Sequence, residues 1–344
     1  VLSDMMAELK KALEEIGIAY FVFDGITGEP TNVMIDEGIA TYKENGCDFC
    51  IGIGGGSPLD SAKAIAAMIT NEGKIADYNG KVIEKPIPPV VAIPTTAGTG
   101  SEATQFTVIT DVEKDIKMLL KGGYLVPKIA IVDPAYTYSA PKSITAATGM
   151  DALTHAIEAY TSRKALPVTD TLAVSAVKRI MKYLPAAYKD GSDEKARYEM
   201  SVASYEAGIC INNSTVTLVH GMSRPIGALF HVAHGISNAM LLTKCLAFAL
   251  DGAYEKFANL GREIGAATAE DDDKTASEKF IEALNEICKI CEIPTLLEYG
   301  IPKDEFFAHM EKMAHDALTS GSPGNTMKPI SEQDIIEIYK KLWE

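Results

Sequence analysis

The chain has 344 residues, which is long enough for two domains with a substantial core in each. Hydrophobic residues make up 47% and charged residues 23%, a balance typical of a globular protein and not of a disordered one. The 47 acidic residues outnumber the 32 basic ones, so the formal net charge of -15 argues against nucleic-acid and anionic-membrane partners. No apolar run reaches the roughly 20 residues that span a bilayer, and no signal peptide is visible, so we expect a cytoplasmic protein.

The first part of the chain alternates predicted helices and strands. Apolar residues at helical spacing predict helices over 2–17, 33–45 and 59–69. Apolar runs predict strands over 19–23, 48–53, 90–93 and 128–132, and a hairpin-like pair over 106–109 and 115–120. This order is typical of an α/β domain. Because it starts with a helix, we expect that an earlier strand either is missing from this sequence or was not observed.

A glycine turn follows the strand at 48–53. Gly55 and Gly56 lie in it, and Ser57 and Pro58 lead into the next helix. Glycines let a ligand approach the backbone, and a helix N-terminus offers free N–H groups to an anion, so the turn is a candidate phosphate cradle. Pro58 suits the first turn of that helix. The turn lacks the full G-x-G-x-x-G fingerprint and is a weak signal by itself.

A second polar loop, with Thr95, Thr96 and Thr99, leaves the strand at 90–93. Ligands of open α/β sheets bind outside the carboxyl ends of the strands, so two such loops indicate one bound nucleotide. The alternative is two ordinary surface turns. Lys117, in the hairpin, either neutralises phosphate or is a solvated strand residue.

From about residue 140 onward the pattern becomes helical, so we predict an α/β domain over 1–140 and an all-helical domain over 141–344. The predicted helices are 143–161, 168–184, 194–211, 216–228, 235–249, 253–264, 276–291, 303–316 and 332–344. The cysteines include C-x-x-C pairs at 47/50 and 288/291. We interpret them as reduced structural thiols in preference to a zinc or redox site.

The helical half contains a candidate metal site. Asp151 and His155 are four residues apart on a predicted helix, so their side chains share one face. The segment between His220 and His234 contains Pro225 and glycines, a spacing that can return the second imidazole to the same place. One Asp and three His suit iron(II) or zinc. Each residue alone is more often a hydrogen-bonded core or surface group, but four polar groups in an apolar setting need a common partner.

With these residues laid out, the chain resembles the iron-containing (group III) alcohol dehydrogenases. The matching blocks are Gly54-Gly55-Gly56-Ser57-Pro58-x-Asp60-x-x-Lys63, Pro94 to Glu102, Val108 to Asp111, Asp133-Pro134, Gly149 to Tyr160 and His220 to Gly235. The resemblance implies a dehydroquinate synthase-like fold with an α/β N-terminal dinucleotide-binding domain and an all-α C-terminal domain. It implies that Asp151, His155, His220 and His234 are metal ligands. It also implies that Gly55, Gly56, Asp60, Thr95, Thr99 and Lys117 contact NAD or NADP.

The chain departs from the family pattern at three places. The family's first strand, which carries the residue that chooses between NAD and NADP, is absent from the sequence, so both cofactors remain open. Glu29-Pro30-Thr31 stands where many members have Asn-Pro-Thr. Arg224 stands where many members have a second His, one turn after the ligand that matches His220. Because a guanidinium stays protonated, Arg224 either binds an anionic group of the substrate or forms a structural pair with an acid such as Glu158.

These observations predict a metal-dependent, NAD(P)-linked alcohol dehydrogenase or aldehyde reductase that uses Fe2+ or Zn2+. Its expected partner is a small alcohol or aldehyde, and we expect a homodimer or larger homo-oligomer. The alternatives are a hydroxyacid-oxoacid transhydrogenase, a glycerol dehydrogenase-like enzyme of the same fold, and a non-catalytic metal- or nucleotide-binding protein.

Overall fold

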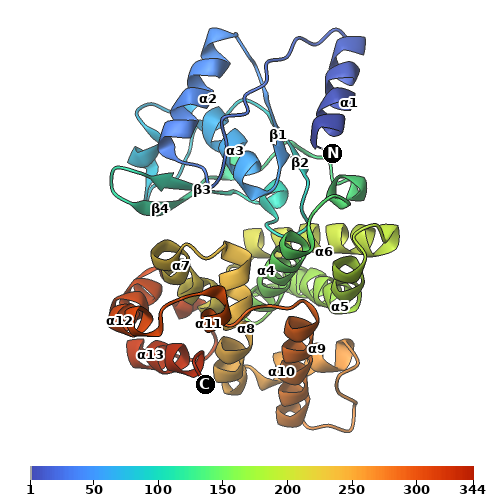
Figure 1. The fold of residues 1–344 in the computed structure, drawn as a ribbon, viewed down its shortest axis with the longest axis vertical. Helices are drawn as coiled ribbons and strands as arrows, with labels where there is room; N and C mark the ends of the chain where they lie inside the picture. Colours follow the sequence, from blue (N-terminus) through green and yellow to red (C-terminus); the bar gives the residue numbers. More distant parts are fainter. Residues whose placement is uncertain (1) are drawn as a thin grey trace. The chain divides into compact units, whose positions relative to one another are not determined.

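The computed structural model describes residues 2–344, with side chains from Met5 onward. The predicted apolar position at Leu2 therefore lies outside the described side chains. The chain divides into two compact units, Val1–Ala140 and Pro141–Glu344, which are considered separately below. Figure 1 colours the chain from one end to the other. Within residues 2–344, no helix is long and apolar enough to cross a membrane.

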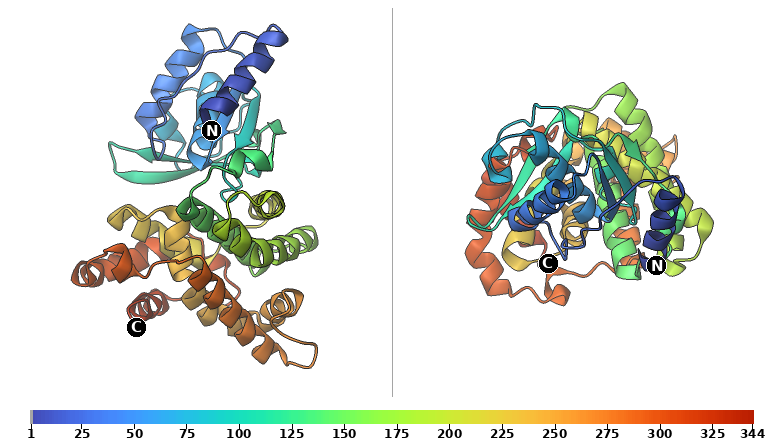
Figure 2. Two further views of the ribbon diagram at one scale, coloured as in Figure 1. Left: turned by 45° about the vertical axis from the view of Figure 1, so that its right-hand side comes forward. Right: turned by 90° about the horizontal axis from the view of Figure 1, so that it is seen from above.

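The first unit is an α/β structure, as predicted. Its elements are α1 (Leu2–Glu15), α2 (Asn32–Glu44), β1 (Cys50–Gly54), α3 (Gly56–Thr70), η1 (Ile75–Tyr78), β2 (Val90–Pro94), η2 (Ser101–Ala103), β3 (Phe106–Asp111), β4 (Ile116–Lys121), η3 (Gly123–Leu125), β5 (Ile129–Ala130) and η4 (Pro134–Thr137). β1, β2 and β5 form a parallel sheet in that order, and β3 and β4 form an antiparallel pair. α3 packs on β1 and β2, and α2 packs against α3 (Figure 2).

The core of this unit explains the packing. Ile35 of α2, Ile65 of α3, and Ile109 and Met118 of the β3–β4 pair belong to one cluster of buried apolar side chains. Gly38 of α2 lies so close to α3 that an added Cβ would be 2.3 Å from Ile65. The helical spacing of apolar residues at 33–45 and 59–69 therefore correctly predicted α2 and α3, because those apolar residues form the helix faces that this cluster buries.

Two strand predictions in this unit need correction. Residues 19–23 were predicted as a strand, but they lie in an irregular segment. Phe21 and Val22 are exposed there, and a strand needs a neighbouring strand for its backbone hydrogen bonds, which no described segment provides. The strand predicted at 128–132 is reduced to the short β5, whose partner is β2.

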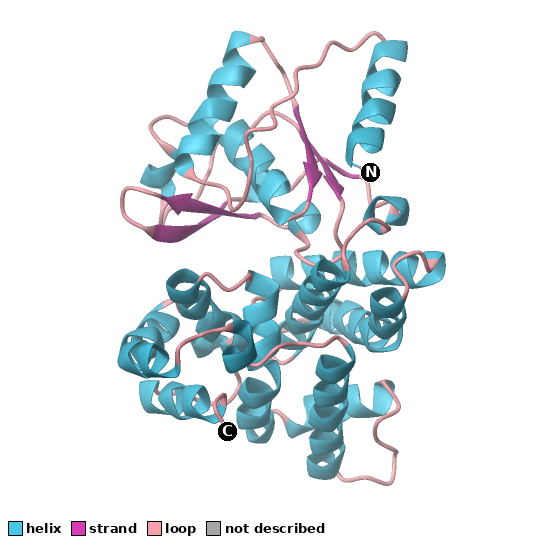
Figure 3. Cartoon of the chain, viewed as in Figure 1, coloured by secondary structure: helices cyan, strands magenta, loops and turns pink. Residues whose placement is uncertain are grey.

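The second unit is helical, and within residues 141–344 the structure has no strand (Figure 3). Its elements are α4 (Lys142–Tyr160), α5 (Pro167–Lys189), α6 (Glu194–Asn213), α7 (Leu218–Phe230), α8 (His234–Ala249), η5 (Leu250–Gly252), α9 (Tyr254–Glu263), α10 (Asp273–Ile290), α11 (Leu296–Tyr299), α12 (Lys303–Thr319), η6 (Pro323–Asn325) and α13 (Glu332–Lys341). α4 packs against α5, α6, α7 and α8, so it is central to the helical unit. The prediction missed the short α11 and ended α5 at Leu184, whereas the helix continues beyond Pro185.

Candidate metal centre and nucleotide-binding loops

Helix α4 carries three polar side chains on one buried face. Asp151, His155 and Glu158 follow one another at i, i+4 and i+7, and all three are buried. Alanines fill much of the rest of the helix, so its neighbours can pack closely. Such buried polar groups need partners, and the neighbouring helices α7 and α8 supply them.

Glu158 connects α4 to the first turn of α7. One of its carboxylate oxygens accepts hydrogen bonds from Thr217 Oγ1 at 2.8 Å and from the Val219 N–H at 2.6 Å. A carboxylate is well placed at a helix N-terminus, where it meets free N–H groups and the positive end of the helix dipole. The other oxygen lies 2.5 Å from His220 Nδ1. This contact fixes the ring so that His220 Nε2 points away from Glu158.

Helix α8 begins with His234 and packs on α4 through Gly235. An added Cβ at Gly235 would lie 2.2 Å from the carbonyl oxygen of Ala147 in α4, so only glycine permits this approach. Asn238 follows His234 by one turn on the same face.

The four predicted metal ligands lie together around Asp151. Asp151 Oδ1 is 3.5 Å from His220 Nε2, 3.6 Å from His234 Nε2 and 3.8 Å from His155 Nε2. One ligand atom each from Asp151, His220 and His234 lies within 4.8 Å of the other two. His155 lies beside this group, with its ring stacked on that of His220 at a centroid distance of 4.6 Å.

The Asn238 amide marks the point on which these atoms converge. Its Nδ2 lies 2.7 Å from Asp151 Oδ1, 3.1 Å from His220 Nε2 and 3.3 Å from His234 Nε2. An amide nitrogen has two protons for these three neighbours, so the arrangement is not a set of fully matched hydrogen bonds. Three acceptor atoms directed at one point, from one carboxylate and two imidazoles, fit a divalent cation such as Fe2+ or Zn2+.

The electrostatics of the cluster also favour a cation. Burial alone would raise the pKa of Asp151, but the surrounding imidazoles hold it well below its usual value. Burial would lower the pKa of His220, yet the carboxylates of Glu158 and Asp151 raise it to about 9. Two buried carboxylates thus stabilise positive charge at this place, and a divalent cation has to displace any proton on His220.

Sequence reasoning considered Glu158 only as a partner of Arg224 and assigned no role to Asn238. Both were detectable in principle, because Glu158 is two turns after Asp151 and Asn238 is one turn after His234. What the sequence could not supply was the partner of each side chain, since those partners lie 62 and 87 residues away along the chain.

Arg224 lies on α7, one turn after His220. Its Nη1 donates to Ser322 Oγ at 3.0 Å. Glu158, considered as its ion-pair partner from the sequence, instead binds His220, Thr217 and Val219.

In the first unit, both predicted nucleotide loops leave the same edge of the sheet. Gly54 pairs with Pro94, and Thr95 N–H donates to Gly54 O at 2.8 Å. Gly54 has a φ of +142° and an added Cβ there would be 2.7 Å from the Pro58 ring. An added Cβ at Gly56 would be 2.9 Å from Thr99 Cγ2, so the two loops are in contact.

Helix α3 starts at this contact. Its N-cap residue, Gly55, has no side chain to cap the first N–H groups, and Gly56 and Ser57 form the first turn. Thr96 lies next to Gly55, where an added Cβ would be 3.5 Å from Thr96 Oγ1. Uncapped N–H groups beside small polar side chains can bind a phosphate.

A buried network holds the loops in place. Asp60 accepts hydrogen bonds from Ser101 Oγ at 2.5 Å and from the Val108 N–H at 2.8 Å. Lys63 Nζ, which is fully buried, donates to Thr104 Oγ1 and to the Phe106 carbonyl. Asp60 is thus engaged within the protein, and its role as a cofactor contact stays a prediction.

Lys117 is also engaged. Its Nζ lies 2.7 Å from Glu29 Oε1, so the acid that departs from the family pattern forms an ion pair with the predicted phosphate-binding lysine. Both side chains are partly exposed.

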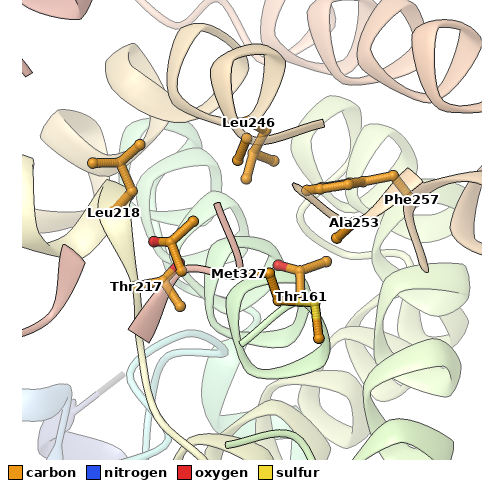
Figure 4. A pocket seen from close by; sticks show the side chains of 9 residues that line it. Thr161, Thr217, Leu218, Leu246, Ala253, Phe257 and Met327 are labelled. Carbon is orange, nitrogen blue, oxygen red and sulfur yellow. The ribbon is translucent and has the colours of Figure 1, made fainter. Parts of the chain in front are cut away.

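A small cavity in the helical unit is not part of the metal site. It has a volume of about 10 Å³ and is lined by Thr161, Thr217, Leu218 and other residues shown in Figure 4. That volume holds roughly one water molecule. None of the four predicted ligands lines it.

Comparison with known proteins agrees with this geometry. Residues 1–134 match the model of the iron-containing alcohol dehydrogenases, and residues 145–343 match that of the C-terminal part of the same family. The chain belongs to the iron-containing alcohol dehydrogenase family. The resemblance inferred from the sequence motifs is therefore confirmed, and with it the fold class.

Relatives within the iron-containing alcohol dehydrogenases match nearly the whole chain. The NAD-dependent methanol dehydrogenase of Bacillus methanolicus is 38% identical over 335 residues, which cover 97% of this chain and 87% of that protein. The crystal structure of a 1,3-propanediol oxidoreductase has a TM-score of 0.92 at 36% identity and covers 96% of this chain and 86% of its own. The structure of the sulfoacetaldehyde reductase of Bifidobacterium kashiwanohense, solved in complex with NAD+, has a TM-score of 0.84 at 29% identity. It covers 98% of this chain and 88% of its own.

Proposed function

We propose that this protein is a metal-dependent, NAD(P)-linked alcohol dehydrogenase or aldehyde reductase. The observation that carries the proposal is the convergence of Asp151 Oδ1, His220 Nε2 and His234 Nε2 on one point. His155 completes the set beside them. Membership of the iron-containing alcohol dehydrogenases supports Fe2+ as the metal, and the donor set is equally suited to Zn2+.

The chain's own residues position the reacting groups. Glu158 holds His220 with Nε2 directed at the shared point, and the Asp151 carboxylate supplies negative charge there. When bound, the metal supplies Lewis-acid polarisation of the substrate C–O bond. A nicotinamide cofactor held by the first unit would accept the hydride from the carbinol carbon in alcohol oxidation, with the hydroxyl proton released to solvent, and aldehyde reduction would be the reverse.

The cofactor belongs, in this proposal, to the domain formed by residues 1–140. Gly55, Gly56 and Ser57 present the start of α3 to a phosphate, and the loop with Thr95, Thr96 and Thr99 lies against them. Asp60 and Lys117 are further proposed contacts. The NAD named for two relatives supports a nicotinamide cofactor, and NADP remains open for this chain.

The named substrates of the relatives differ in size and charge, from methanol to sulfoacetaldehyde. The family assignment therefore supports the reaction class and not a particular substrate.

The test combines metal analysis with steady-state kinetics. We expect purified protein to contain a single divalent ion per chain and to oxidise NADH or NADPH when short aldehydes are added. Asp151→Asn and His234→Ala should lose both metal and activity. Metal-loaded protein without turnover on any aldehyde would contradict the proposal, and hydride exchange between two acids without net cofactor consumption would indicate a transhydrogenase.

A further inference from the structure

Helix α7 presents two functional side chains on one face. His220 and Arg224 are one turn apart, so their Cβ atoms are about 5–6 Å from each other. The helix continues past Pro225 to Phe230, so both residues belong to one rigid element. A substrate whose oxygen is near His220 therefore comes close to the Arg224 guanidinium.

The guanidinium is held in place by a neutral group. Arg224 Nη1 donates to Ser322 Oγ, and Ser322 is buried just before η6. η6 packs against α7 at Gly221, where an added Cβ would be 2.6 Å from the Pro323 ring. The absence of a side chain at Gly221 thus lets Ser322 reach Arg224. A hydroxyl oxygen orients the guanidinium but leaves its charge in place.

Among the described residues, Arg224 forms no salt bridge with an acid; burial lowers the pKa of its guanidinium, and the charge of Glu158 opposes this from a longer distance. The hydrogen-bond acceptor of Arg224 is the neutral Ser322 Oγ. The two oxygens of Glu158 are already engaged by His220, Thr217 and Val219. A guanidinium has five N–H donors, and a partly buried cation without a direct ion-pair partner is unfavourable, so the remaining donors are available to an anion.

The charge balance of the site points the same way. Asp151 and Glu158 together balance one divalent cation, so Arg224 adds one positive charge in excess. The chain as a whole carries a formal charge of -15, which repels anions at long range. An excess positive charge beside the candidate metal site therefore favours binding of an anion that is already close, and it does not attract anions from a distance.

We propose that Arg224, oriented by Ser322, binds an anionic group on the substrate of the proposed oxidoreductase. The group is a carboxylate, sulfonate or phosphate on the same small molecule that carries the alcohol or aldehyde. Two parallel hydrogen bonds from the guanidinium fit such an oxyanion. The inference rests on the proposed function, because it assigns the second recognition point of that reaction.

The experiment compares small aldehydes of different charge, of which butanal and 4-oxobutanoate have the same chain length. Steady-state kcat/KM is measured for butanal, for 4-oxobutanoate and for the cationic betaine aldehyde, with a sulfonate and a phosphonate analogue as further arms. We expect wild-type protein to prefer 4-oxobutanoate to butanal, and betaine aldehyde to be the poorest substrate. Arg224→Ala should lower kcat/KM for the acid roughly 10- to 100-fold more than for butanal, mainly through KM. Arg224→Lys should retain part of the preference, because it keeps a charge but not the bidentate geometry.

Arg262→Ala is the matched control. Arg262 is an arginine of the same unit that pairs with Asp273 on α10, away from the ligand cluster. This variant should keep the preference for the acid. Equal losses for butanal and 4-oxobutanoate in Arg224→Ala would overturn the inference, because they would indicate a general structural role.

A binding measurement separates this inference from the proposed function. Calorimetric titration of metal-loaded protein with 4-hydroxybutyrate, in comparison with 1-butanol, does not require turnover. We expect the acid to bind more tightly and Arg224→Ala to remove that advantage. If no aldehyde is reduced but this result holds, the proposed function fails and the anion site stands. If wild-type protein reduces aldehydes but binds both ligands equally, the anion site is refuted.

Discussion

Glu158→Gln tests how the metal site is held together. Glu158 accepts three hydrogen bonds, with Thr217 and Val219 on one oxygen and His220 Nδ1 on the other. If the Gln oxygen keeps the first two, its NH2 group faces His220 Nδ1, and the ring must then carry its proton on Nε2, the predicted ligand atom. If the amide is reversed, its NH2 group faces the Val219 N–H. Two donors then oppose each other, and the buried N–H loses its acceptor, which costs about 1–3 kcal/mol of stability.

Both orientations of the amide therefore weaken the site. Loss of a group that orients a metal-binding histidine typically lowers affinity about 10- to 100-fold, which corresponds to about 1.4–2.7 kcal/mol. The assay is competition for Zn2+ between the protein and a chelator of known affinity, with circular dichroism to verify folding. Glu206→Gln is the control, since Glu206 is a half-buried acid of α6 that binds Ser175. A Glu158→Gln protein with wild-type affinity for Zn2+ would refute the proposed role of the Glu158–His220 contact.

Two further substitutions address the packing that supports each site. Gly235→Ala places a methyl group against the Ala147 carbonyl, so we expect it to destabilise the helical unit by about 1–3 kcal/mol in urea unfolding and to weaken Zn2+ binding. Lys63→Met leaves the partly buried carboxylate of Asp60 and the buried carboxylate of Glu102 without their cation, so we expect a loss of about 3 kcal/mol in the stability of the α/β unit.

The Lys63→Met effect should depend on pH in a defined direction. Burial raises the pKa of both Asp60 and Glu102, although Lys63 opposes this in the wild-type protein. Without Lys63 the folded state holds protons at higher pH than the unfolded state, so stability falls as pH rises through their folded pKa values. The stability difference from wild type should therefore be smaller at pH 5 than at pH 8. Lys81→Met, at an exposed lysine, should show no such difference.

Hydrophobic periodicity and turn residues were enough to predict most of the fold. The faces of α2, α3 and α4 follow from sequence because helical spacing is local. The strand prediction at 19–23 was wrong because strand formation depends on non-local pairing. Its apolar residues favour an extended chain, but a strand forms only with a hydrogen-bonding neighbour, and the sheet order of β1, β2 and β5 is not a local property.

The metal site shows the same division. Asp151 and His155 were predicted to share a face because both lie on one helix. The approach of His234 depends on the chain reversal after α7, where His231 adopts a left-handed conformation with a φ of +53°, and on the close contact of Gly235 with α4. Neither feature can be read from residue spacing. The spacing only allowed His220 and His234 to meet, and the resemblance to a family was the further reason to group them.

Three helices contribute to this site in the same manner. Each supplies one atom of the converging set and, one turn later on the same face, a second polar side chain: Asp151 with His155 on α4, His220 with Arg224 on α7, and His234 with Asn238 on α8. Because i and i+4 side chains are neighbours, the second member of each pair lies beside the converging atoms, where His155 is a further proposed ligand and Arg224 a proposed substrate contact. The hydrogen bonds that hold His220 come from Glu158 and do not involve Arg224. If Arg224 binds the substrate as proposed, a substitution there should change substrate preference and leave His220 in place.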